Sequence, residues 1–169
     1  MSNQNGLETE YKYLIYYPDI DILCEQEKSR IVDIEQIYLD SESPFTARVR
    51  RWTEDGVTHF FYTSKKRISK QTAEEHETEI SEEEYERYLC HADIDLHIVP
   101  SKRRFIIPFG GHDMEIDIYP FWTKQAILEI EISKENEHVD IPPYLIIMRD
   151  VTGDKRYKNY SLAQSIPEE

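Results

Sequence analysis

Two stretches in the second half of the chain decide the fold: Met114-Glu115-Ile116-Asp117-Ile118-Tyr119 and Ala126-Ile127-Leu128-Glu129-Ile130-Glu131-Ile132. In both, acidic side chains alternate with apolar ones. Because successive side chains of a β-strand point to opposite faces, this period-two pattern predicts two strands. The preceding strand-like segment, Lys102–Phe109, is joined to the first of them by a Gly-Gly turn. Each strand would therefore present an apolar face and a charged face.

Like charges two residues apart recur along the rest of the chain, and this spacing puts both members of a pair on one face of a strand. The acidic pairs are Glu8 and Glu10, Glu77 and Glu79, Glu115 and Asp117, and Glu129 and Glu131; the basic pairs are Arg48 and Arg50, and Lys102 and Arg104. One pair alone would fit an ordinary solvated face. A whole set, with acids and bases on different strands, predicts a polar surface that binds metal cations and phosphates.

Residue propensities, turn residues and helix caps predict the remaining strands and helices. We expect strands at Leu7–Tyr16, Asp33–Leu39, Thr46–Trp52, Thr58–Thr63 and Glu75–Ile80. We expect helices between about Ile20 and Ile31, from Glu82 to His91 after a Ser81 capping box, and in the tail near Leu162. About eight short strands with two or three helices predict a mainly β fold with some α (α+β), an antiparallel barrel or sandwich with helices outside.

Length and charge narrow the classes of function. The 169 residues suit a single domain spanning 1–169, and no apolar run is long enough to cross a bilayer. The net charge of −14 opposes binding to long nucleic acids. Two cysteines make no disulfide framework, so we expect a cytoplasmic protein. We expect neither a nucleic-acid nor a membrane partner, and we leave open whether the chain forms a homodimer.

The acids and bases complement each other chemically. Mg²⁺ and Mn²⁺ prefer oxygen ligands, and the candidate ligands are Glu8, Glu10, Glu129 and Glu131, with Glu77, Glu79 and Asp117 able to complete the set. The candidate phosphate-binding residues are Lys12, Arg48, Arg50, Lys65, Lys102 and Arg104. Four cations next to these, Arg51, Lys66, Arg67 and Arg103, are expected to be exposed. Six cations beside a group of acids could bind a chain of phosphates, with metal ions between the acids and the phosphates.

The order of these motifs resembles the CYTH superfamily of triphosphate tunnel metalloenzymes. Glu8-Thr9-Glu10-Tyr11-Lys12 is similar to its ExExK signature. The resemblance continues through Gln36-Ile37-Tyr38-Leu39, Arg48-Val49-Arg50, Thr63-Ser64-Lys65, Glu77-Thr78-Glu79-Ile80, Lys102-Arg103-Arg104, Glu115-Ile116-Asp117, Leu128-Glu129-Ile130-Glu131 and Asp150-Val151-Thr152. ExExK alone would be weak, whereas the ordered set is specific.

This resemblance implies an eight-stranded antiparallel barrel around a charged tunnel, and hydrolysis or cyclisation of a triphosphate with Mg²⁺ or Mn²⁺. It implies metal binding by Glu8, Glu10, Glu129 and Glu131, with Glu79 and Asp117 nearby. The six cations would hold the phosphates. Tyr38 and Lys102 resemble a pair that positions or activates water, and Lys12 is the third residue assigned to catalysis.

Three functions are compatible with these residues. The first is metal-dependent hydrolysis of a small triphosphate, above all inorganic tripolyphosphate. The second is adenylate cyclisation, which would yield cyclic AMP and pyrophosphate from ATP. The third is a barrel that binds polyphosphate or nucleotide without chemistry. The acids argue against the third, because a pure anion binder needs no carboxylates in its site.

Overall fold

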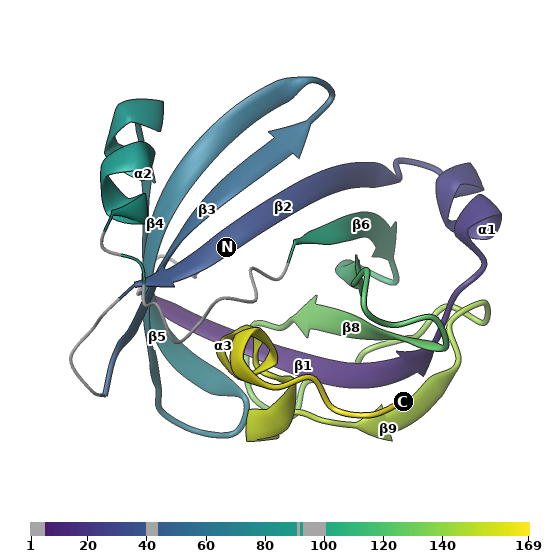
Figure 1. Ribbon diagram of the computed structural model, residues 1–169. Coiled ribbons are helices and arrows are strands. Elements are labelled where there is room, and N and C mark those ends of the chain that lie inside the picture. The colour runs from purple at the N-terminus through teal and green to yellow at the C-terminus, as the bar shows by residue number, and fades with distance from the viewer. Residues whose placement is uncertain (1–5, 40–43, 91, 93–100) are drawn as a thin grey trace.

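The computed structural model describes residues 6–39, 44–90, 92 and 101–169, and it consists mostly of strands with a few short helices (Figure 1). The strands are β1 (Leu7–Tyr16), β2 (Arg30–Leu39), β3 (Thr46–Glu54), β4 (Val57–Arg67), β5 (Thr72–Ile80), β6 (Lys102–Phe109), β7 (His112–Ile118), β8 (Gln125–Glu131) and β9 (Ile147–Asp150). The helices are α1 (Ile20–Glu25), α2 (Glu82–Leu89), the 3₁₀ turn η1 (Lys155–Tyr157) and α3 (Asn159–Gln164).

Eight of the strands close into an antiparallel barrel, as predicted. The strand order is β5-β4-β3-β2-β6-β7-β8-β1, and β1 pairs with β5 to complete the ring. The hairpin between β3 and β4 turns at Asp55 and Gly56, whose φ angles of 48° and 76° are those of the tight turn that Asp-Gly favours. The short β9 adds to the outside of the ring by pairing with β1. Closure leaves each barrel strand with two neighbours, so an inner and an outer face are defined all the way round.

Several predicted boundaries were wrong. The short helix expected between about Ile20 and Ile31 is confirmed as α1, which ends at Glu25, but β2 begins at Arg30 and not at the predicted Asp33. Strand β4 extends to Arg67, beyond the predicted end at Thr63. Helix α2 ends at Leu89; His91, the predicted end, lies outside the described residues. Strand β9 was not predicted, because four residues carry too short a pattern to identify.

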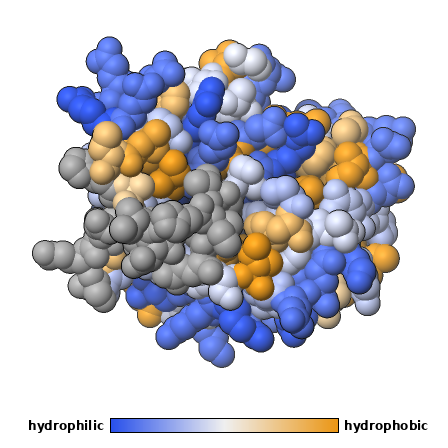
Figure 2. Space-filling model, viewed as in Figure 1, coloured by the Kyte–Doolittle hydropathy of each residue, from blue (hydrophilic) through white to orange (hydrophobic). Residues whose placement is uncertain are grey.

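The hydrophobic core lies mainly on the outer face of the barrel. Its largest cluster joins outward side chains of β6, β7 and β8 to Leu23 of α1 and Leu145. A second cluster packs Tyr85 of α2 against Phe60 of β4, with ring centroids 4.9 Å apart. In the described part of the chain, no helix is long and apolar enough to cross a bilayer. The face seen in Figure 1 is largely hydrophilic, with small separate hydrophobic patches (Figure 2).

Both ends of the inner face become apolar. At one end Leu14, Tyr119 and Ile127 pack against Trp122, Tyr157 and Leu162, which places α3 over the barrel (Figure 1). At the other end Val32, Ile34 and Ile106 form a small cluster with Trp52. The charged residues therefore occupy the middle of the interior, between these two clusters of apolar side chains.

Candidate active site inside the barrel

Strand register brings the predicted charges onto one face, because residues directly opposite each other in an antiparallel pair share a face. Lys12 lies opposite Glu129, and Glu10 lies opposite Glu131. The same face continues through the register pairs Glu115 and Glu129, Arg104 and Asp117, Gln36 and Arg50, Thr63 and Glu77, and Lys65 and Glu75. All six predicted cations and six of the seven candidate acids meet inside the barrel, while the seventh acid, Glu79, ends at its rim.

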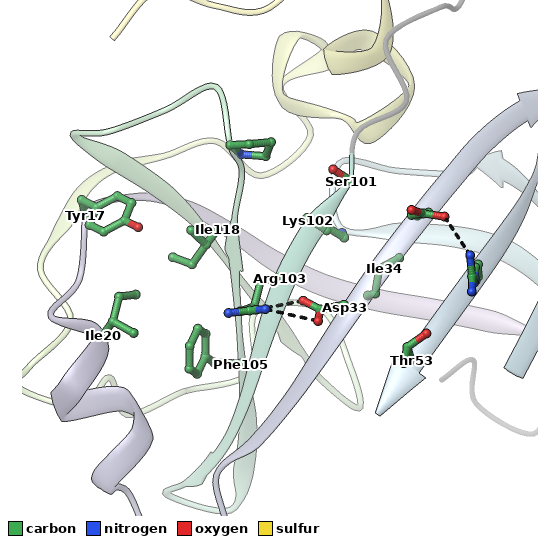
Figure 3. Close-up of a pocket in the computed structure, with 13 residues that line it drawn as sticks. Tyr17, Ile20, Asp33, Ile34, Thr53, Ser101, Lys102, Arg103, Phe105 and Ile118 are labelled. Atoms are coloured by element: carbon green, nitrogen blue, oxygen red, sulfur yellow. Dashed lines mark hydrogen bonds and ion pairs between the residues drawn. The ribbon is translucent and has the colours of Figure 1, made fainter. Parts of the chain in front are cut away.

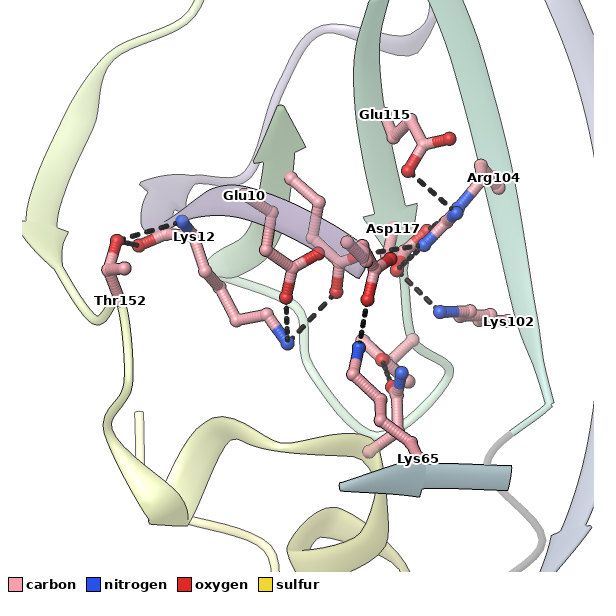
Figure 4. A network of polar contacts seen from close by, with 12 residues as sticks. Glu10, Lys12, Lys65, Lys102, Arg104, Glu115, Asp117 and Thr152 are labelled. Atoms are coloured by element: carbon pink, nitrogen blue, oxygen red, sulfur yellow. Dashed lines mark hydrogen bonds and ion pairs between the residues drawn. The ribbon is translucent and has the colours of Figure 1, made fainter. Parts of the chain in front are cut away.

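One side of the interior, formed by β1, β6, β7 and β8, is rich in acids; we call it the acid-rich half. Arg104 is its centre and contacts three carboxylates: Asp117 at 2.7 Å, Glu115 at 2.8 Å and Glu129 at 2.9 Å. Its neighbours Lys102 and Lys12 bind Asp117 at 2.6 Å and Glu129 at 3.0 Å (Figure 4). Lys102 and Asp117 are both almost completely buried. Each cation of this half is therefore neutralised by carboxylates.

The opposite side, formed by β2, β3, β4 and β5, is the base-rich half. Arg48 donates to Gln36 Oε1 at 3.1 Å, and Arg50 forms an ion pair with Glu77. Glu77 also accepts from Thr63 at 3.0 Å. Two buried donors of this half, Gln36 Nε2 and Arg50 Nε, have no hydrogen-bond partner. An unpaired buried donor is costly, so these two atoms favour a ligand with acceptor oxygens.

Lys65 joins the two halves where β1 meets β5. Its ammonium forms an ion pair with Glu8 and lies 3.6 Å from Glu75. Glu75 is buried, and sequence analysis missed it as a site residue. The signal that identifies Glu75 is its place two residues before Glu77, on the same face of β5.

Two acids of β1 show opposite electrostatic shifts. Burial raises the pKa of Glu8, but the charge of Lys65 and its hydrogen bond outweigh this and bring the pKa to about 2. Burial and the negative charge of Glu8 raise the pKa of Glu10 to about 7. Near neutral pH a carboxyl with such a pKa is protonated in a large share of the molecules, and a cation that binds beside it would displace the proton.

The three residues assigned to catalysis lie inside the barrel. Burial and the positive charge of Arg104 lower the pKa of Lys102 to about 8, while burial raises the pKa of Tyr38. Tyr38 lies opposite Arg48 and packs edge-on against Tyr160 of α3, with ring centroids 5.1 Å apart. The main chain of Lys12 is held by Thr152, which accepts from Lys12 N at 2.9 Å and explains why the Val-Thr segment follows β9. Tyr38 and Lys102 are both buried, and no hydrogen bond joins them.

The acids of the interior have the oxygen ligands that a divalent cation requires. Glu8, Glu10 and Glu129 provide carboxylate oxygens, the ligands that Mg²⁺ and Mn²⁺ prefer. Within the described residues, however, no three such side chains converge into a ready metal site. Lys12 and Lys65 neutralise these acids here. Binding a metal therefore requires the carboxylates to turn from ammonium groups toward the ion.

Three predicted placements differ from the structure. Glu79 was expected among the metal ligands, but its side chain is 60% exposed and bonds His59 at the barrel rim. Arg67 was expected to be exposed, yet it is half-buried and shares the face of Lys65, because the register of β4 and β5 continues without a bulge to Arg67. Lys66 is also half-buried, beside the Phe45 ring. Arg51 and Arg103 are exposed as predicted.

A surface pocket of about 630 Å³ is separate from this interior (Figure 3). It lies between the start of α1 and the outer side of β2, β3 and β6, and the exposed ion pair of Arg103 and Asp33 crosses it. Of the predicted site residues only Lys102 lines it. The chemistry of the charged residues therefore does not belong to this pocket.

Comparisons with known proteins agree with the motif order. The family model of the CYTH domain matches residues 6–141. The crystal structure of the inorganic triphosphatase NE1496 shares 26% identity, covers 95% of this chain and 97% of that chain, and superposes with a TM-score of 0.58. The PH1819 protein from Pyrococcus horikoshii OT3 shares the fold at 22% identity and a TM-score of 0.58, over 76% of this chain and 80% of that chain. A search among curated proteins gives no match.

Proposed function

The chain belongs to the CYTH domain family, and from this premise we propose that it is a metal-dependent hydrolase of small triphosphates, with inorganic tripolyphosphate as its simplest substrate. The inorganic triphosphatase NE1496, similar over nearly the whole chain, supports this choice of substrate. The charged pairs by themselves are compatible with hydrolysis and with cyclisation, so the similarity to a triphosphatase favours hydrolysis.

The balance of charge inside the barrel carries the proposal. The six inner cations are Lys12, Arg48, Arg50, Lys65, Lys102 and Arg104. They share the interior with more acids: Glu8, Glu10, Glu75, Glu77, Glu115, Asp117, Glu129 and Glu131. A triphosphate would meet net repulsion here. Divalent cations held by the acids would reverse the sign of the interior, which is why substrate binding should depend on metal.

The two halves would then take different parts in the reaction. The acid-rich half would hold the metal through Glu8, Glu10, Glu129 and Glu131, with Asp117 behind them. A metal held there would supply positive charge that offsets the charge of the phosphate oxygens. The base-rich half would donate to the phosphates through Arg48, Arg50 and Gln36, which fixes the chain in line for attack.

Water would attack the terminal phosphorus of this fixed chain. The bond from that phosphorus to its bridging oxygen breaks, and the leaving diphosphate takes the electron pair. Lys12 and Arg104 lie where they can offset the charge of the departing group. Tyr38 and Lys102 are the residues that we assign to positioning the water.

Phosphate release from tripolyphosphate, in Mg²⁺ or Mn²⁺ and in EDTA, tests the proposal. We expect turnover only with metal. Glu8→Gln should reduce it by about 100-fold or more, because a ligand charge is lost from the site. Glu74→Gln is the matched control: Glu74 lies next to Glu75 on the opposite face of β5 and bonds His76 outside the barrel.

Two outcomes would contradict the proposal. Undiminished wild-type turnover in EDTA would exclude a metal-dependent reaction. Cyclic AMP and pyrophosphate formed from ATP, without orthophosphate from any triphosphate, would identify a cyclase instead.

A further inference from the structure

The surface pocket beside α1 has an apolar side that the core leaves partly uncovered. Ile20 and Ile118 are half-buried at the edge of the largest core cluster, and Phe105 of that cluster also lines the pocket. Tyr17 lies with them and keeps 39% of its surface exposed. Figure 3 shows these four side chains gathered on one side of Arg103. Apolar surface inside a cavity of about 630 Å³ is typical of a site for a small organic molecule.

The polar side of the pocket has two ion pairs of unequal strength. Arg103 donates to both carboxylate oxygens of Asp33, at 2.8 and 3.2 Å. Arg51, by contrast, lies 3.8 Å from Glu35, which is longer than the limit of about 3.2 Å for a hydrogen bond. Within the part of the chain that the structure describes, Glu35 is the only acid that pairs with Arg51. Arg51 therefore keeps donors for the oxygens of an anion.

Arg103 lies between the apolar side and Arg51. Its guanidinium is paired with Asp33 through its edge, and its side chain is 57% exposed. A guanidinium is planar and weakly hydrated, and its face stacks well on a flat aromatic ring. The exposed face of Arg103 can therefore contact a flat group that enters the pocket.

The pocket spans four neighbouring strands. β3, β2, β6 and β7 follow one another in the sheet. Arg51 belongs to β3, Arg103 to β6, and Ile118 is the last residue of β7. Because neighbouring strands lie about 4.8 Å apart, the backbones at the two ends of the pocket are separated by roughly 14 Å. Side chains reach inward from both ends, so an elongated ligand with its charge at one end can contact all three residues.

We propose that this outer pocket binds a flat organic acid, with its carboxylate at Arg51, its ring on Arg103 and its apolar part against Tyr17 and Ile118. This ligand differs in class from the inorganic phosphates proposed for the interior, which have no apolar part. The inference does not depend on the proposed function, because the side chains that carry it lie outside the barrel.

Calorimetric titration of the full chain with 4-phenylbutyrate tests the site. This probe has a ring at one end and a carboxylate at the other, and we expect saturable binding in the millimolar range or tighter. 4-Phenylbutyramide has the same body without the charge and should bind about tenfold more weakly, since it loses the charged hydrogen bond. Butyrate keeps the charge but has no ring, and it should bind at least about tenfold more weakly, because it buries little apolar surface.

Two variants locate the two ends of the probe. Arg51→Gln should weaken binding of the acid about tenfold and leave binding of the amide unchanged, whereas Arg51→Lys should retain most of the affinity. Arg87→Gln is the matched control, because it removes the same charge from the exposed side of α2. Tyr17→Ser should weaken binding of the acid and the amide alike. Its control is Tyr16→Ser, at the neighbouring exposed tyrosine that does not line the pocket.

Three results would overturn the inference: no detectable binding of 4-phenylbutyrate at tens of millimolar, equal affinities for the acid and the amide, or affinities that neither Arg51→Gln nor Tyr17→Ser changes. Binding of the acid that falls in both variants and persists in their controls would support it. These titrations need neither metal nor tripolyphosphate. Failure of the proposed triphosphatase activity would therefore leave the pocket proposal intact, and failure of probe binding would leave the proposed activity intact.

Discussion

The two halves of the barrel interior use similar cations in different ways. In the acid-rich half, Arg104 binds three carboxylates and Lys102 is enclosed with Asp117. In the base-rich half, Arg50 has one carboxylate partner and a buried Nε without any, and Gln36 Nε2 is likewise unpaired. One half has its hydrogen-bonding capacity satisfied by the protein, while the other retains donors for a ligand.

The difference between the two halves explains how a barrel can bury many charges, remain folded and still bind a ligand. Burying an ion is costly unless it is paired, so most of the charges must be compensated for the barrel to fold. Unpaired donors are tolerated only in small number, and they mark the places where the fold gives up stability. We therefore expect substitutions in the acid-rich half to affect stability strongly, and substitutions in the base-rich half to affect substrate binding and turnover more than stability.

Replacing the central arginine of the acid-rich half should have the largest effect. Arg104→Met leaves Asp117, Glu115 and Glu129 without their shared partner, and we expect the free energy of unfolding to fall by about 3–5 kcal/mol. Urea denaturation measures this loss. Arg103→Met is the matched control, because Arg103 is adjacent, exposed and paired only with Asp33; its cost should stay below about 1 kcal/mol. Similar losses for both variants would show that the acid-rich half is not specially dependent on its pairing.

The pKa of Glu10 predicts a pH dependence confined to the acid-rich half. Its folded-state pKa of about 7 lies above the ordinary glutamate pKa of about 4.5, so the folded state keeps a proton that the unfolded state releases. Wild-type stability should therefore fall as pH rises from 5 to 8, whereas Glu10→Gln has no such proton to lose. Urea denaturation in EDTA should show the variant gaining about 2–3 kcal/mol relative to the wild type over this range. A constant difference between the two proteins would show that Glu10 titrates normally.

Arg50→Lys tests the base-rich half. Lysine can keep the ion pair with Glu77 but lacks the forked donor that matches phosphate oxygens. We expect kcat/KM for tripolyphosphate to fall roughly 10- to 100-fold, with a stability change below about 1 kcal/mol. Arg51→Lys, on the outer face beside Glu35, should change neither quantity. A stability loss comparable to that of Arg104→Met would remove the distinction between the halves.

The sequence predicted the barrel and most of its charged interior, because both depend on local periodicity. Once Glu129 and Lys12 are placed on strands, the two-residue spacing fixes which neighbours share their face. The ordered motifs supplied the closure of the ring, which periodicity alone could not distinguish from a sandwich.

Residues at strand ends were harder to predict. Arg67 was misplaced because β4 was expected to stop at Thr63, so the alternation through Lys65 was not extended to it. Glu75 was missed because the motif was read from Glu77 onward, although Glu75 lies deeper in the barrel. Tyr160 meets Tyr38 of the inner face only through the packing of α3, a tertiary contact with no periodic signal. Pairing within the interior was also beyond sequence reasoning, since it depends on which side chains meet across strands.

The boundary of the base-rich half can be tested along one strand with the smallest expected effect. Glu77 and Glu79 share the inner face of β5, but Glu77 binds Arg50 and Thr63, whereas Glu79 reaches the exposed rim and bonds His59. We expect Glu79→Gln to leave kcat/KM within about twofold of wild type, because an exposed ion pair contributes little. Glu77→Gln should lower kcat/KM by more, since it frees Arg50 from its partner and alters the position of the guanidinium. Measurement of both variants at several Mg²⁺ concentrations decides the role of Glu79: a metal ligand would show a raised metal requirement after substitution, and a rim residue would not. A marked loss in Glu79→Gln alone would mean that the interior site extends further along β5 than the side-chain contacts indicate.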